Sequence, residues 1–323
     1  MITKYQEMAK AGDTRPSRFV ASTFVILYFF FIIGSIIVTI PFIIVLLLNR
    51  EILMDLMTNT AQIDLSKVFG QMPNYILTNL SIYCMLLGVI IAVKYIHYRP
   101  LTTLITTKKK IQWSRFFTSF FVYGVLISLG SLVDYFISPE TYSMTFDASR
   151  FWLALPVILI MTPIQTTTEE LVFRGYVIQS FGLKIKNGFI LSMLSGFLFT
   201  LPHLANPEIY ASNKLGVFST ICMILNYFVM GAVLALITIK TNSLEAAMGA
   251  HAVNNLFCFL LVGYPDGAIP TNTVFFTTNF EPISGLISVI ITSILFYFIS
   301  AALLGSRLYK QEPTAAKLRN KCD

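Results

Sequence analysis

The sequence has 323 residues, of which 55% are hydrophobic and only 12% are charged, and its mean hydropathy is +0.72. Soluble globular domains contain about 25% charged residues, so a water-soluble fold could not bury this much apolar surface. The net charge of +7 does not indicate nucleic-acid binding, because the lysines and arginines gather in short segments between long apolar runs. The composition therefore predicts an all-α, polytopic membrane helix bundle with the lipid bilayer as its main partner.

Eight segments are apolar enough to span a bilayer, since a spanning helix needs about 20 mostly apolar residues. We expect these spans at about 19–48, 76–97, 116–137, 152–180, 188–204, 215–239, 243–263 and 283–304. With a cytoplasmic N-terminus, the basic residues left outside by this layout are Arg50, Lys67, Arg150 and Lys214. Most of the others fall on the cytoplasmic side, as the positive-inside rule requires. Residues 1–323 are thus predicted to form a single integral-membrane domain with both termini cytoplasmic.

Two adjacent acidic residues, Glu169 and Glu170, lie inside an apolar span, where ionisable groups are costly unless they are paired or face water. Arg174 follows Glu170 by four residues, so the two share a helix face and are expected to form an ion pair. Glu169 lies about 100° away around the helix and has no such partner in its own segment. We therefore expect Glu170 and Arg174 to be structural and Glu169 to be the chemically available carboxylate.

Two histidines stand in other spans, His203 near the end of the fifth and His251 within the seventh. Asn255 follows His251 by four residues and shares its helix face. At a rise of about 1.5 Å per residue, Glu169 and His251 lie near the middle of the membrane, whereas His203 lies closer to the outer side. A tilted or broken fifth helix, which Pro202 permits, would bring His203 to the other two.

The order of these motifs, E-E-x-x-x-R, F-x-x-x-H and H-x-x-x-N, resembles the CPBP intramembrane proteases. That family includes the CAAX prenyl endopeptidases and the bacterial bacteriocin-processing and immunity proteins of the Abi type. The positions that carry the resemblance are Glu169, Glu170, Arg174, Phe199, His203, His251 and Asn255. The resemblance covers about residues 150–263, and it implies hydrolysis of a peptide bond by a glutamate-activated water, with the histidines and the asparagine assisting.

The residues themselves favour the same chemistry, because neither a G-x-S-x-G motif nor a Cys–His pairing supplies a protein nucleophile. Glu169 would act as general base, His203 would orient the water, and His251 with Asn255 would stabilise the oxyanion. Alternatively, Glu169, His203 and His251 would bind zinc with a water in the open position. No H-E-x-x-H helix is present, so we favour a site without a cofactor.

Two other classes of function stay open. One is a non-catalytic membrane scaffold or bacteriocin-immunity or regulatory protein, which Glu169→Ala and His203→Ala variants with an unchanged cellular phenotype would indicate. The other is a proton-coupled transporter, since a Glu/His cluster in a membrane also suits proton relay, although no inverted repeat is visible. As a protease, the chain is expected to cut a peptide precursor or a membrane protein in a bacterial cytoplasmic membrane.

Overall fold

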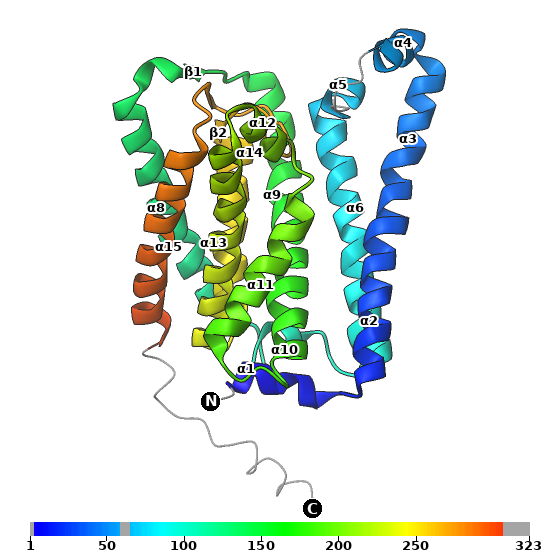
Figure 1. The fold of residues 1–323 in the computed structure, drawn as a ribbon, viewed down its shortest axis with the longest axis vertical. Helices are drawn as coiled ribbons and strands as arrows, with labels where there is room; N and C mark the ends of the chain where they lie inside the picture. Colours follow the sequence, from blue (N-terminus) through cyan, green and yellow to red (C-terminus); the bar gives the residue numbers. More distant parts are fainter. Residues whose placement is uncertain (1–2, 59–64, 306–323) are drawn as a thin grey trace, which may run out of the picture.

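The computed structural model describes residues 3–58 and 65–305 as a bundle of long helices with a small sheet at one end (Figure 1). Apolar stretches fold into helices because a helix satisfies its own backbone hydrogen bonds where no water is available. The α-helices are α1 (Lys4–Glu7), α2 (Pro16–Tyr28), α3 (Gly34–Leu48), α4 (Arg50–Thr58), α5 (Leu65–Phe69), α6 (Gln71–Ile91), α7 (Thr102–Ile105), α8 (Trp113–Ile137), α9 (Ala148–Glu170), α10 (Val177–Phe181), α11 (Gly188–His203), α12 (Pro207–Lys214), α13 (Val217–Thr241), α14 (Glu245–Leu260) and α15 (Pro282–Gly305).

Short segments of tighter or wider helix and three short strands complete the described chain. The 3₁₀-helices are η1 (Met8–Ala11) and η4 (Pro139–Thr141), and the π-helices are η2 (Phe29–Ile33), η3 (Ala92–Ile96) and η5 (Leu171–Tyr176). The strands are β1 (Tyr142–Met144), β2 (Val262–Gly263) and β3 (Phe275–Thr277). Each π-helix continues an α-helix without a break, so α2–η2–α3, α6–η3 and α9–η5–α10 are three long rods.

The prediction of a polytopic helical membrane protein is confirmed, but the number of spans is smaller than expected. Within the described residues, six helices or rods are long and apolar enough to cross a membrane: Pro16–Leu48, Gln71–Ile96, Trp113–Ile137, Ala148–Phe181, Val217–Thr241 and Pro282–Leu304. A seventh is counted if α11 and α12, which meet at 84°, form one broken span. The seventh predicted span, 243–263, contains the 16-residue helix α14, whose length of about 24 Å is less than the roughly 30 Å of a bilayer core.

Helix α14 is short because it lies inside the bundle. It packs against α8, α9 and α13, and nearly every residue from Glu245 to Ala252 is buried. Protein surrounds this helix where lipid would surround a peripheral one, so it need not match the thickness of the hydrocarbon core. Hydropathy predicted a full-length span here because it does not distinguish a helix buried in protein from one exposed to lipid.

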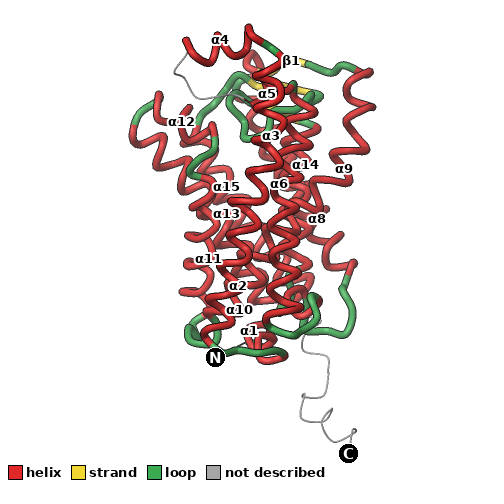
Figure 2. Tube along the Cα trace, turned by 90° about the vertical axis from the view of Figure 1, so that its right-hand side faces the viewer, coloured by secondary structure: helices red, strands yellow, loops and turns green. Residues whose placement is uncertain are grey.

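The two ends of the described chain lie at the same end of the bundle. Figures 1 and 2 show α1 and α10 at this end, which we call the N-terminal end, and α12 with strand β1 at the opposite end. Helix α15 runs back to the N-terminal end. The side of the membrane that this end faces stays a prediction, and the basic tail at 306–323 lies outside the described residues.

The opposite end carries structure that the apolar pattern did not predict. Strand β3 pairs antiparallel with β1, with Tyr142 opposite Thr277, and parallel with β2. The connection between the first two predicted spans contains α4 and α5. The sheet joins the connections before α9 and after α14, so the two helices that carry the acidic pair and His251 are linked at this end.

Gly249 sets how closely α14 approaches α8. A Cβ atom on Gly249 would lie 2.1 Å from the carbonyl oxygen of Phe116 and 3.1 Å from the nitrogen of Phe120. The backbones therefore touch at this crossing, and a glycine is the residue that permits it. His251 lies two residues further along the same helix, so this contact also positions the histidine.

We expect Gly249→Ala to lower the midpoint of thermal unfolding, because the added methyl group must push α14 away from α8. Overpacking of this kind costs about 1–3 kcal/mol. The matched control is Gly285→Ala, where the new Cβ would meet only the amide of Asn226 at 3.7 Å. Thermal unfolding of both variants in detergent micelles is followed by circular dichroism. Equal shifts of the two midpoints would contradict the expectation.

Candidate active site

A buried carboxylate that contacts side chains of two helices lies at the centre of the site. Glu170, the last residue of α9, is fully buried, and its Oε1 lies 2.9 Å from Nη1 of Arg174 and 2.7 Å from Nδ1 of His251. The ion pair expected between Glu170 and Arg174 is therefore present, and both side chains are shielded from solvent. Because the carboxylate accepts the proton on Nδ1, the Nε2 atom of His251 is the ring nitrogen left for other chemistry.

Glu169 points to a different environment from its neighbour. Its Oε2 lies 3.8 Å from Nε2 of His251, a separation that one bridging water can span. Within its own segment, Glu169 has a neutral hydrogen-bond partner that was not predicted, because Nε2 of Gln165 donates to its Oε1 at 3.1 Å. Gln165 precedes Glu169 by one helical turn, so the i,i+4 spacing could have revealed this contact. One carboxylate oxygen is thus held and the other is free.

A change of helix type follows the acidic pair directly. The π-helix η5 begins at Leu171 and contains Arg174. Wider turns of this kind are often found inside α-helices at functional sites, since they rotate the following residues relative to the preceding ones. Here the guanidinium of Arg174 lies over the ring of Phe199, with Cζ 4.0 Å from its centroid, a favourable cation–π arrangement.

Phe199 joins the two histidines, as a supporting residue would. Its buried ring lies 4.4 Å from the ring of His203 and 5.8 Å from that of His251. His203 is the last residue of α11, and its Nδ1 donates to the carbonyl oxygen of Phe199 at 2.7 Å. The chain bends after His203, between α11 and α12. The break that Pro202 was expected to permit is not at Pro202, because α11 continues through it to His203, and His203 reaches the site from the end of its helix.

Asn255 lies one turn beyond His251 on α14, and both side chains line the same cavity. Its Oδ1 accepts from the amide of Asn254 at 3.1 Å. With that oxygen occupied, the amide group of Asn255 is left as a donor. Asn254 and Tyr227, whose ring lies 4.5 Å from that of His203, are site residues that sequence patterns did not indicate. Tyr227 comes from α13, and no spacing rule relates it to the motifs.

A cavity of about 1980 Å³ contains the predicted reactive groups. Glu169, His203, His251 and Asn255 all line it, and it runs from Phe181 near the N-terminal end of the bundle to loop residues at the opposite end. One wall is formed by apolar residues of α2 and α6, which stand together at one flank of the molecule in Figure 1. The site therefore combines a few polar groups with a long apolar channel.

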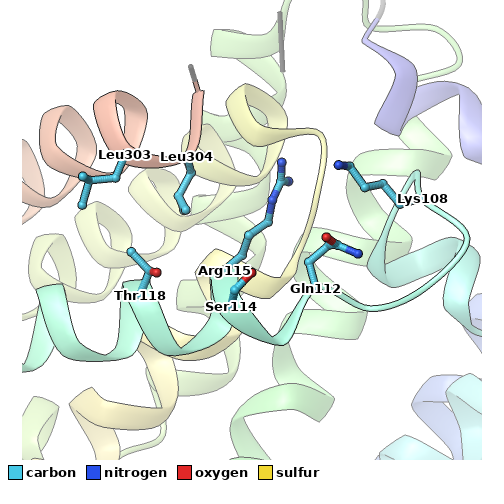
Figure 3. A pocket seen from close by; sticks show the side chains of 7 residues that line it. All are labelled: Lys108, Gln112, Ser114, Arg115, Thr118, Leu303 and Leu304. Carbon is cyan, nitrogen blue, oxygen red and sulfur yellow. The ribbon is translucent and has the colours of Figure 1, made fainter. Parts of the chain in front are cut away.

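A second, smaller pocket is unrelated to these groups. It has a volume of about 150 Å³ and lies between the start of α8 and the end of α15 (Figure 3). Its main polar group is Arg115, which donates to the carbonyl oxygen of Thr241 at 3.1 Å. None of the predicted site residues lines it.

The side chains predicted as alternative zinc ligands, Glu169, His203 and His251, come from three different helices. In the part of the chain that the structure describes, no group of three or more His, Cys, Asp or Glu has a metal-binding arrangement. Nδ1 of each histidine is already engaged, with Glu170 in one case and with the Phe199 carbonyl in the other. Glu169, His203 and His251 therefore converge on one cavity without the geometry of a metal centre.

Comparison with known proteins agrees with the location of this site. Residues 149–257 match the family described as type II CAAX prenyl endopeptidase Rce1-like, and this segment contains all seven motif positions. An uncharacterized protein, YyaK of Bacillus subtilis (strain 168), is 42% identical over 176 residues, which are 54% of this chain and 56% of that relative. The chain thus spans about half the length of this relative. No solved structure matches the chain.

We expect Arg174→Met to lower the free energy of unfolding by about 3–5 kcal/mol, because it leaves the buried Glu170 without its cation. The double variant Glu170→Gln/Arg174→Met removes both charges and should recover most of that loss. Chemical unfolding in micelles measures both effects.

The control for this pair is Arg150→Met, which breaks an exposed ion pair with Asp147. Exposed pairs contribute about 0–1 kcal/mol, so little change is expected. A double variant as unstable as Arg174→Met alone would show that the charge pairing is not what Arg174 supplies.

Proposed function

We propose that this chain, whose residues 149–257 match the Rce1-like family of type II CAAX prenyl endopeptidases, is an intramembrane endopeptidase that uses a glutamate-activated water. The observation that carries the proposal is the difference between two adjacent carboxylates. Glu170 is held by Arg174 and His251, whereas Glu169 keeps one oxygen free in a cavity that also contains His203 and Asn255.

Glu169 and His203 would hold the attacking water. Nδ1 of His203 donates to a backbone carbonyl, so Nε2 of the neutral ring is an acceptor. A water between this nitrogen and Oε2 of Glu169 would donate one hydrogen to each. Glu169 then removes a proton as the water oxygen attacks the peptide carbonyl carbon, and a positioned base of this kind accelerates the step by about 10²–10⁴-fold.

Asn255 and His251 would stabilise the oxyanion. The side-chain amide of Asn255 is available because Asn254 occupies its oxygen, and Nε2 of His251 donates when it carries a proton. Donors fixed before the reaction stabilise developing charge strongly in a site with little water. When the C–N bond breaks, the proton held by Glu169 passes to the leaving nitrogen, so the products are a carboxylic acid and an amine.

The size of the cavity supports a peptide as substrate. Small-molecule sites usually have volumes of about 300–1,000 Å³, and the cavity here is about 1980 Å³. Apolar residues of α2 and η2, among them Phe19, Phe24 and Phe31, form part of its wall. We infer that the substrate is an apolar segment of a peptide precursor or a membrane protein. The bacterial relative supports a bacterial cytoplasmic membrane as the location.

We expect Glu169→Gln to abolish cleavage, with a loss of about 10²–10⁴-fold, because the amide keeps the shape of the side chain but cannot accept a proton. Comparative proteomics of membranes from cells with the wild-type chain and with Glu169→Gln would reveal peptides whose cleavage disappears. Glu140→Gln, at an exposed carboxylate, is the matched control. Identical cleavage patterns in all three would favour a non-catalytic role, and proton-coupled flux lost only in Glu169→Gln would favour a transporter.

We also expect the purified chain to keep its activity, within about twofold, after treatment with 1,10-phenanthroline and dialysis. The reason is that Glu169 activates the attacking water as a general base, so no zinc ion is needed to activate it. Adding back zinc after dialysis is the control. A loss of activity that zinc restores would contradict the proposed mechanism.

A further inference from the structure

A second buried carboxylate lines the cavity beyond the catalytic groups. Glu208 lies in the first turn of α12, just after the bend that follows His203, and only 1% of its surface is exposed. It belongs to the same cavity as Glu169 and His251. None of the motifs includes it, and the proposed hydrolysis does not use it.

Only one of the two oxygens of Glu208 is occupied. Oε1 accepts from the hydroxyl of Tyr264 at 3.1 Å and from the backbone N–H of Ala268 at 2.7 Å. Oε2 has no hydrogen-bond partner although it is buried. Within the described residues, no lysine, arginine or histidine pairs with Glu208.

The other fully buried glutamates, Glu170 and Glu245, also have an Oε2 without a hydrogen-bond partner, but each has a cation nearby. Glu170 has Arg174 beside it, and Glu245 accepts from the N–H of Gln112 with Arg115 in electrostatic range. A buried carboxylate without a cation is costly. Glu208 is therefore an acidic group in a substrate channel whose positive partner is not supplied by the described part of the chain.

Aromatic side chains surround this carboxylate and connect it to the catalytic groups. Tyr264 contacts it directly, and Tyr227 is close enough to interact with it. The ring of Tyr227 lies against His203, while its hydroxyl accepts from Asn206 at 3.0 Å. One tyrosine side chain thus separates His203 from Glu208. An extended peptide, at roughly 3.3 Å per residue, covers such a distance in about two or three residues.

We propose that Glu208 binds a positively charged group of the substrate, a lysine or arginine side chain or a free amino terminus, within about three residues of the bond that is cut. The proposal rests on the proposed protease function. Carboxylate oxygens and tyrosine rings both attract cations, and charge-assisted hydrogen bonds are the strong ones in a dry site. The cation would reach Oε2 by displacing a tyrosine side chain, while the N–H of Ala268 still holds Oε1.

The test uses the purified full chain in lipid nanodiscs and the membranes of a host strain that lacks it as the source of substrates. Cleavage sites are mapped by labelling new amino termini, and only those lost with Glu169→Gln are kept. Peptides spanning one such site are then made in two forms, with the basic residue or with glutamine in its place. Glu208→Gln, Glu208→Asp, Tyr264→Phe and the exposed control Glu140→Gln are compared with the wild type.

We expect Glu208→Gln to lower kcat/KM for the basic peptide at least tenfold through KM, and to change it less than twofold for the glutamine peptide. Glu208→Asp, which keeps the charge, should still prefer the basic peptide. Cleavage sites that have no Lys, Arg or amino terminus within three residues would overturn the proposal. Equal losses of activity on both peptides in Glu208→Gln and Tyr264→Phe would also overturn it, because they would indicate that Glu208 only holds the loop in place. Failure of the proposed function would appear earlier, as an absence of cleavage that depends on Glu169.

Discussion

The contact of Glu170 with two partners determines the geometry of the whole site. Its fully buried carboxylate is shared by a cation from its own rod and a histidine from α14. Charges in such a place are tolerated only when their partners are fixed, because no water can replace a lost contact. The ring of His251 therefore has its Nδ1 committed, and its Nε2 is turned toward Glu169 at 3.8 Å.

Two identical neighbouring residues acquire different chemistry from this arrangement. Successive residues on a helix point about 100° apart, so when Glu170 is turned into the protein, Glu169 is turned toward the cavity. Gln165 occupies one oxygen of Glu169 and leaves the other available. The orientation of Glu169, the proposed base, thus depends on Glu170, because the contacts of Glu170 set the orientation of the helix that carries both.

The sequence was most informative where interactions are local or follow hydropathy. Long apolar runs predicted the rods, and the four-residue spacing predicted the pairing of Glu170 with Arg174. Non-local features were missed. The strands β1 and β3 pair Tyr142 with Thr277, Tyr227 approaches His203 from another helix, and α14 is shielded by protein along its length. Each depends on how distant segments pack, which neither spacing nor hydropathy records. Gln165 is different, because its spacing from Glu169 was visible.

The bend after His203 explains why recognition and chemistry would lie close together. If α11 continued straight, Glu208 would lie more than one turn beyond His203 along the same axis. Instead α12 turns by 84°, with Pro207 at its first position, where proline is well tolerated because that N–H would have no helical partner. Tyr227 contacts both sides of the bend, stacking on His203 and accepting from Asn206. The residue that positions the histidine therefore also positions the start of α12, so the bend couples the location of His203 to that of Glu208.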